Sequence, residues 1–216
     1  MVADGWRMSE RVEVPDDALP VARRYLRIER LLSGGVAVVV GLLGAAAYLA
    51  LPLLWALAVI LGLLALARVP VFRTNGRARL RTGADPASVR DDFTGATPPP
   101  LALQWGIADD VRVDGEDAVY EISYFLGLRS VEMRAEAESE DDRVVITGTV
   151  DGEPWGTYDA RIEPTERGTE IVVDVRSDRK FGLRRLPQQF VARRFRDAAL
   201  RAQGYEVIER SSSLSR

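Results

Sequence analysis

The 216-residue chain contains no cysteine and no histidine. Without cysteine it can form no disulfide, no thiolate nucleophile and no thiolate metal site. Without histidine it lacks the usual general base near neutral pH and the commonest zinc ligand. The two absences exclude Ser-His-Asp triads and His-ligated metals, and no motif indicates a carboxylate site for magnesium or calcium. We therefore expect no cofactor, no metal site and no catalytic residues.

Lysine is almost missing as well, since Lys180 is the only one among 29 basic residues. A high ratio of Asp and Glu to Lys is typical of salt-adapted, high-GC organisms. Residues 1–81 carry 11 basic and 6 acidic side chains, a net of +5, whereas residues 82–216 carry 18 and 26, a net of −8. An acidic domain repels phosphate backbones, so nucleic acid is not an expected partner.

Ionisable side chains are missing from a run of 37 residues, 31–67. One straight helix of that length would measure about 55 Å, much more than the roughly 30 Å hydrocarbon core of a bilayer. Pro52 interrupts the run near its middle, where a proline and the residue before it disfavour helix. The sequence therefore predicts a transmembrane hairpin of two helices at residues 31–67.

Arginines flank this run on both sides, and the predicted turn carries no charge. Under the positive-inside rule both ends then lie in the cytoplasm, which makes a multi-pass cell-membrane protein with a cytoplasmic soluble domain. Three alternatives are a single kinked span, a cleaved signal peptide and a buried helical pair of a soluble protein. The flanking arginines are Arg23, Arg24, Arg27, Arg30, Arg68, Arg73, Arg77, Arg79 and Arg81.

Residues 1–30 are expected to form a cytoplasmic tail followed by a juxtamembrane helix. The arginines at positions 23, 24, 27 and 30 are candidates for binding anionic lipid headgroups, although topology alone explains them equally well. Small residues recur every four positions from Ser33 to Ala45, which allows a homo-oligomer through the hairpin. Because no ionisable group lies inside the run, we interpret it as an anchor rather than a transport path.

After the membrane run the hydrophobic period changes from helical to two. Tyr120 and Ile122, for example, alternate with Glu121 and Ser123. Asp-Gly and similar turn pairs separate the alternating runs, which is a hairpin signal. One apolar and one polar face per strand indicates an antiparallel sheet, and the order predicts a meander of about six strands.

Two helices and one more strand complete the predicted domain. A strand at 78–82 precedes a short helix at 86–93, for which Asp85 is a plausible cap. A long C-terminal helix at 186–203 carries an apolar stripe that should cover the sheet. Residues 68–76 are expected to be a linker and 204–216 a C-terminal tail. The stripe consists of Val191, Phe195, Ala198 and Ala202.

The segment RLRTGADPASVRDDFTG resembles the opening of the SRPBCC superfamily, through Ala84, Asp85, Pro86 and Val89. This superfamily has the helix-grip fold and includes START-like lipid carriers, plant hydrophobic-ligand binders and polyketide cyclase-like proteins. The resemblance covers residues 77–203 and implies an α+β domain, in which a curved antiparallel sheet packs on the long C-terminal helix. One departure is Thr97-Pro98-Pro99-Pro100, which leaves little room for the second short helix that often closes the cavity mouth. The superfamily shares no catalytic residue set.

A curved sheet that grips a helix often leaves a cavity between the two. Large apolar residues of the predicted strands and helices are then candidates for a ligand pocket, although a solid core that they simply fill explains them better. An acidic run at 136–142 is better explained as a solvated strand end than as a cation site. The pocket candidates are Trp105, Tyr120, Tyr124, Met133, Trp155, Tyr158 and Phe195.

These features predict a membrane-anchored, SRPBCC-like domain that binds a hydrophobic small molecule or lipid at the cytoplasmic membrane surface without catalysis. The first alternative is a membrane-tethered protein-interaction module with a solid core, and the second is a cyclase-type enzyme. An apolar cavity of roughly 300 Å³ or more between sheet and helix would favour ligand binding. A fully packed interior would favour the interaction module.

Overall fold

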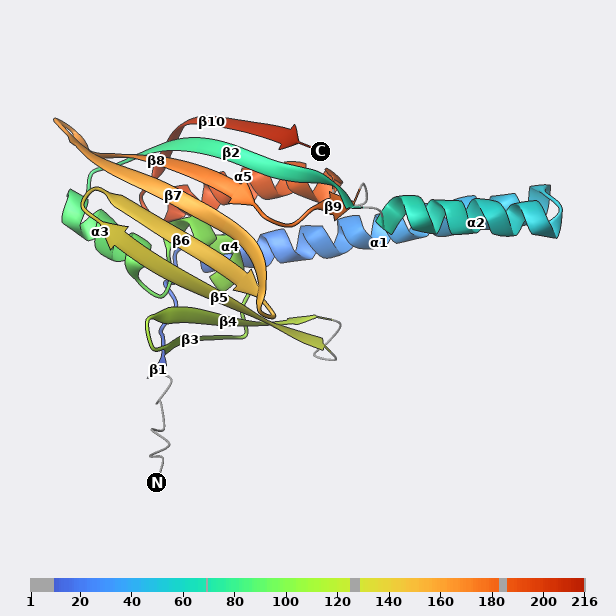
Figure 1. Ribbon diagram of the computed structural model, residues 1–216, viewed down its shortest axis with the longest axis horizontal. Helices are drawn as coiled ribbons and strands as arrows, with labels where there is room; N and C mark the ends of the chain where they lie inside the picture. The colour runs from blue at the N-terminus through green and yellow to red at the C-terminus, as the bar shows by residue number, and fades with distance from the viewer. Residues whose placement is uncertain (1–9, 69, 125–128, 183–185, 216) are drawn as a thin grey trace, which may run out of the picture.

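A computed structural model of the chain describes residues 10–68, 70–124, 129–182 and 186–215. Within these residues the chain has a mixed α+β fold. Nine strands follow one another in a single antiparallel sheet, in the order β1-β3-β4-β5-β6-β7-β8-β2-β10, and β9 pairs with β2 beside this path. The sheet is curved, and helices lie against its concave face (Figure 1).

Six consecutive strands form the meander that the alternating pattern predicts, and each pairs antiparallel with the next. Asp151 and Gly152 both have positive φ, 52° and 79°, in the turn between β6 and β7. Asp-Gly adopts this mirror-image turn readily, and it matches the twist of the flanking strands. The strands are β3 (Asp110–Asp114), β4 (Asp117–Tyr124), β5 (Arg129–Glu140), β6 (Arg143–Val150), β7 (Glu153–Thr165) and β8 (Gly168–Ser177).

The sheet extends beyond the meander on both sides. β2 (Pro70–Thr82) pairs with β8, and β10 (Glu206–Ser215) pairs with the other edge of β2. The structure thus corrects two expectations, because most of the predicted linker belongs to β2 and the predicted tail forms β10. β10 has a largely polar sequence, which an edge strand tolerates because only part of it is buried. The two shortest strands are β1 (Glu10–Arg11), which pairs with β3, and β9 (Phe181–Gly182).

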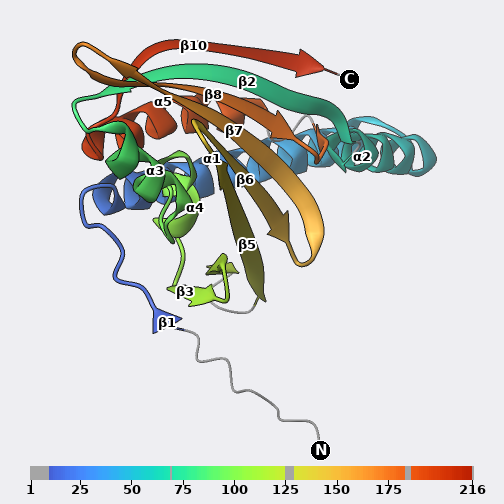
Figure 2. The same ribbon diagram turned by 60° about the vertical axis from the view of Figure 1, so that its left-hand side comes forward.

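Helices fill the concavity of the sheet, as Figure 2 shows. The predicted short helix is present as α3 (Pro86–Thr94), and the Asp85 side chain caps it by accepting from the backbone N–H groups of Ala87 and Ser88. The long C-terminal helix is α5 (Leu186–Ala202). The expectation that the prolines leave little room for a second short helix is wrong. They start it, because proline suits the first helical turn, and the chain forms η1 (Pro99–Leu101) and α4 (Ala102–Trp105).

Two long apolar helices adjoin this domain. α1 (Leu19–Ala50) ends at Leu51-Pro52, where the break is predicted, and α2 (Leu53–Arg68) runs back along it (Figure 1). Within the described residues, α1 alone is long and apolar enough to cross a membrane, and the apolar part of α2 is shorter. Large apolar side chains are exposed on both helices; Leu42 is 65% exposed and Trp55 66%.

The first turns of α1 belong to the core of the sheet domain. Ala18 and Ala22 are fully buried, and the ring of Tyr25 lies 5.7 Å from that of Phe195 on α5. This corrects the expected boundaries, which left residues 1–30 outside a domain of residues 77–203. The contact escapes sequence reasoning because alanines carry no clear signal of the surface that they face.

Candidate functional site

A cavity of about 110 Å³ lies between α5 and the sheet. It forms where small residues meet, since Gly76 and Ala78 of β2 lie across the cavity from Ala199 of α5. Side chains of this size leave space that larger ones would fill. The remaining lining residues are Thr74, Arg77, Pro99, Pro100, Ala102, Leu103, Tyr158, Val173, Val175, Arg193, Arg196, Leu200, Arg210, Ser211 and Ser212.

The walls of the cavity are mainly apolar. Val173 and Val175 of β8 contribute the floor beside Tyr158 of β7, and η1 and α4 add Pro100 and Leu103. One polar atom is out of place in this setting. Thr74 Oγ1 is buried and has no hydrogen-bond partner among the described residues. Buried polar atoms are normally paired, so an unpaired hydroxyl at a cavity wall is available to a ligand or to water.

Four arginines line the same cavity: Arg77 from β2, Arg193 and Arg196 from α5, and Arg210 from β10. Arg210 Nη2 lies 2.9 Å from Asp197 Oδ1, with the two side chains 19% and 26% exposed. The contact lacks hydrogen-bond geometry, and Arg210 Nε is also buried without a hydrogen-bond partner in the described chain. Neither Arg193 nor Arg196 forms an ion pair with any described residue.

The charges of these cavity-lining groups act on one another. Burial lowers the pKa of Arg210, the Asp197 carboxylate opposes this, and the charges of Arg196 and Arg193 lower the pKa further. Burial raises the pKa of the Tyr158 hydroxyl, because it disfavours the charged form here too. The positive charges of Arg196 and Arg210 lower this pKa. The cavity thus concentrates positive charge. It can hold an anion, but it brings no acid and base together.

Among the six predicted pocket residues whose side chains the structure describes, Tyr158 alone lines the cavity. Three others are fully packed in the core. Trp105 is buried and donates from Nε1 to the Pro98 carbonyl oxygen at 2.9 Å. Tyr120 is buried, donates to the Ala96 carbonyl oxygen at 3.0 Å and has a pKa raised by burial. Met133 is 2% exposed.

Trp155 and Phe195 do not line the cavity either. Trp155 is half-buried and stacks on Tyr158, with ring centroids 6.1 Å apart. Phe195 is half-buried against Tyr25 of α1. The side chain of Tyr124 lies outside the described residues. Large side chains therefore fill this core, and the open space lies elsewhere.

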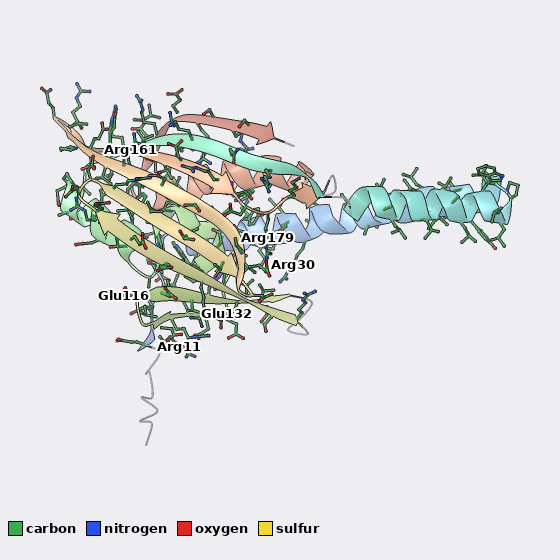
Figure 3. All side chains as sticks on the ribbon, viewed as in Figure 1. Arg11, Arg30, Glu116, Glu132, Arg161 and Arg179 are labelled. Carbon is green, nitrogen blue, oxygen red and sulfur yellow. The ribbon has the colours of Figure 1, made fainter. Side chains whose placement is uncertain are left out.

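The four candidate headgroup-binding arginines, at positions 23, 24, 27 and 30, are all exposed on α1. They stand beside the buried alanines at positions 18 and 22, so α1 carries a packed face and a charged face. Figure 3 labels Arg30 on the part of α1 beside the sheet. None of the four lines the α5 cavity.

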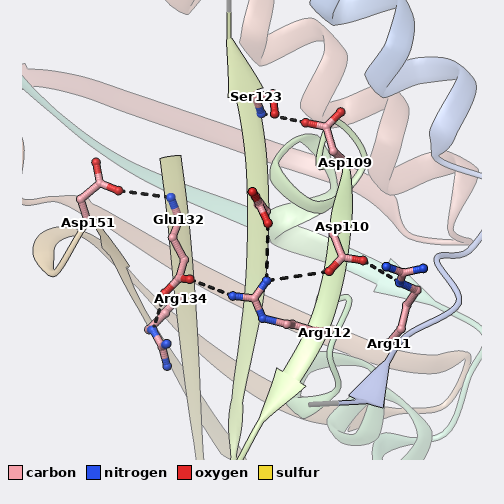
Figure 4. Close-up of polar contacts among 9 residues, drawn as sticks. Arg11, Asp109, Asp110, Arg112, Ser123, Glu132, Arg134 and Asp151 are labelled. Atoms are coloured by element: carbon pink, nitrogen blue, oxygen red, sulfur yellow. Dashed lines mark hydrogen bonds and ion pairs between the residues drawn. The ribbon is translucent and has the colours of Figure 1, made fainter. Parts of the chain in front are cut away.

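A second polar cluster lies on the outer face of the sheet (Figure 4). Arg112 of β3 lies 2.8 Å from Glu132, 3.7 Å from Glu121 and 3.8 Å from Asp110. Asp110 also accepts from Arg11 of β1 at 2.8 Å. Arg112 thus lies among carboxylates of β3, β4 and β5, and such opposite-charge contacts between strands stabilise the sheet. No group of three possible metal ligands occurs among the described residues. The acidic run at 136–142 belongs to these residues and forms no such group.

The cavity arginines were not among the predicted site residues. The spacing of Arg193 and Arg196, three residues apart, places them on one side of α5. That spacing is the available signal. The apolar stripe at positions 191, 195, 198 and 202, however, predicts a different buried face of α5. Among the α5 side chains that the structure describes, 191–202, the most buried are Ala192, Ala199 and Leu200. The sequence gives no signal for Arg210, because residues 204–216 are expected to form a tail.

Comparisons with known proteins add little. No protein-family model matches the chain, and no curated protein matches it. Solved structures match about three fifths of it. A Rhodobacter sphaeroides protein is 18% identical with a TM-score of 0.39, covering 61% of this chain and 90% of its own. A Chromobacterium violaceum protein is 15% identical with a TM-score of 0.41, covering 60% and 95%. A conserved Geobacillus kaustophilus protein is 9% identical with a TM-score of 0.43, covering 60% and 91%. Likeness at this level carries no argument about function.

Proposed function

We propose that this chain is a membrane-anchored, non-catalytic domain that binds a lipid or lipid-like small molecule in the cavity between α5 and the sheet. The observation that supports the proposal most is the cavity itself, with mainly apolar walls and a buried hydroxyl that has no partner among the described residues. Its position agrees with the resemblance of residues 77–203 to the helix-grip fold of the SRPBCC superfamily. In such a fold the space between sheet and helix is the natural ligand site.

The size of the cavity limits what it encloses. At about 110 Å³ it is well below the roughly 300 Å³ at which ligand pockets usually begin. It therefore holds part of a ligand, and the rest of the molecule lies outside. An amphiphile suits this arrangement, because its polar end can enter the cavity while its apolar part stays in a bilayer.

The anchor in this proposal consists of α1 and α2. Their exposed leucines and valines would be unfavourable in water and are favourable in lipid. A helix pair in the bilayer, with arginines at both ends, places the sheet domain at the cytoplasmic surface. The domain then faces a supply of amphiphiles.

A second candidate is a protein-interaction module. Trp105, Tyr120 and Met133 are buried in the same core that contains the cavity-lining Tyr158, and they fill it without leaving space beside them. A domain of this kind needs no ligand and would act through its surface.

Native mass spectrometry of the full chain in mild detergent tests the proposal. The spectrum should show a retained small molecule of lipid mass. Ala199→Leu fills the cavity and should reduce this occupancy, whereas Ala87→Leu, on the exposed side of α3, should not. The comparison of the two variants separates the cavity from lipid that adheres to α1 and α2. Equal occupancy in both variants would contradict the proposal and favour the interaction module.

A further inference from the structure

We infer that the cavity recognises a phosphate group, that Arg193, Arg196 and Arg210 are its ligands, and that an anionic membrane lipid supplies it. The inference rests on the proposed function and specifies its ligand class. It places the phosphate in the cavity and leaves the acyl chains outside.

The charge around the cavity carries the argument. Arg193, Arg196 and Arg210 line it, and among the described lining and neighbouring groups Asp197 alone is paired with one of these three. Arg77 also lines the cavity, but it forms two hydrogen bonds to Asp174, at 2.7 and 2.8 Å. An excess of positive charge in a partly apolar site is unfavourable until an anion neutralises it. The excess is notable because residues 82–216 have a net charge of −8.

The unpaired atoms are donors that suit a phosphate. Arg210 Nε and Thr74 Oγ1 are both buried without a hydrogen-bond partner in the described part of the chain. They come from neighbouring strands, since β10 pairs with β2. Guanidinium groups bind phosphate oxygens through paired N–H donors, and these contacts are stronger than neutral hydrogen bonds. A phosphate with several acceptor oxygens can accept from guanidinium groups of β10 and α5 together.

The position of the cavity favours a lipid as the source. Thr74 lies six residues after Arg68, the last residue of α2. Thr74 is the fifth residue of β2, and four steps along an extended strand span about 13 Å, so the cavity is near the end of the sheet at which β2 begins. Figures 1 and 2 both show the start of β2 and the end of β10 at this end of the sheet. The small volume fits a headgroup better than a whole lipid.

The test compares two lipids with the same acyl chains on the full chain in a neutral detergent. Phosphatidic acid carries the phosphate and diacylglycerol lacks it, and native mass spectrometry measures the bound fraction of each. We expect phosphatidic acid to bind at least about tenfold more tightly, because each charge-assisted contact contributes on the order of a tenfold change. The double variant Arg193→Gln/Arg196→Gln should remove most of this preference. Arg194→Gln, exposed on the same helix, is the matched control and should retain it.

The outcomes separate the two proposals. If inorganic phosphate competes as well as phosphatidic acid binds, the phosphate site stands and the lipid source is overturned. If both lipids bind equally and the double variant has no effect, the phosphate inference is overturned while lipid binding remains. If the preference disappears in Arg23→Gln/Arg24→Gln instead, the site lies on α1 and the inference is also overturned. The two-lipid comparison on the unaltered chain needs no variant to fold.

Discussion

At the scale of single residues, Gly106 sets how closely α1 approaches the sheet domain. A Cβ atom built at this position would lie 2.5 Å from the Ala102 carbonyl oxygen and 2.6 Å from Ala22 Cβ. Both distances are shorter than atoms tolerate without moving. The contact with Ala22 joins α1 directly to the end of α4.

Gly106→Ala should therefore lower the free energy of unfolding by about 1–3 kcal/mol, as overpacked cores do. Gly83→Ala is the control, because a Cβ there would have nothing within 4 Å, and it should change the free energy by less than about 0.5 kcal/mol. Denaturant unfolding of the full chain in mild detergent measures both. Equal effects of the two substitutions would show that α1 does not dock as described.

Asp159 illustrates how the outer face of the sheet depends on pH. Arg143 donates to both of its carboxylate oxygens, at 2.8 and 2.6 Å, and this contact lowers the pKa of Asp159 below its ordinary 3.8. A carboxylate whose folded pKa is depressed stabilises the fold above the unfolded pKa. The stabilisation is lost as the pH falls through the folded value.

Stability should accordingly decline as the pH drops below about 4. Asp159→Asn should be less stable than the unaltered chain at neutral pH and should show a weaker decline in acid, because one of the titrating groups is gone. Thermal unfolding across a pH series gives both comparisons. Parallel pH profiles for the two proteins would contradict this role for the ion pair.

At the scale of elements, α5 is packed on two sides. Ala199 and Leu200 are buried toward the sheet domain, while Phe195 meets Tyr25 of α1. α1 is therefore both the start of the apolar helix pair and a cover for α5. Removing it would expose the side of α5 that carries Phe195.

A truncated chain that begins at Arg73 should not unfold cooperatively, because it lacks α1 and the first residues of β2. A second chain that keeps residues 10–30 and replaces 31–67 with a flexible Gly/Ser linker should fold and stay soluble. Circular dichroism melts distinguish the two. Cooperative unfolding of the chain from Arg73 would show that α1 is dispensable.

Elements whose signals are local were predictable from the sequence. The six-strand meander follows from period-two alternation and turn residues, and the Asp85 cap of α3 follows from four adjacent residues. β10 and the docking of α1 were not predictable. β10 depends on pairing with β2, which is far away in the chain. The docking of α1 depends on α4 and α5, which are also distant in sequence.

The candidate site was predictable only in its place, between the sheet and the C-terminal helix. Large aromatic residues were expected to line it, but residues such as Trp105 fill the core because burying their area is favourable. The cavity arises instead where Gly76, Ala78 and Ala199 face one another. Small residues at a distance in sequence give no sign that they will meet.

At the scale of the whole molecule, the apolar pair of α1 and α2 projects beyond the sheet domain (Figure 1). If the pair crosses the membrane twice, reporter fusions at residues 5 and 216 should both report the cytoplasm. The arginines on both sides of the apolar run are the physical reason. Reports from opposite compartments would mean a single crossing and would place the domain outside.

Photo-crosslinking tests most directly whether a membrane lipid occupies the α5 cavity. The full chain, reconstituted in vesicles that contain a phospholipid with a diazirine near its headgroup, is irradiated and its peptides are mapped by mass spectrometry. If a lipid occupies the cavity, labels should appear on residues 99–103 and on α5 and β10 near Arg196 and Ser212, and they should be lost in Ala199→Leu. Labelling confined to α1 and α2, and unchanged in Ala199→Leu, would contradict it.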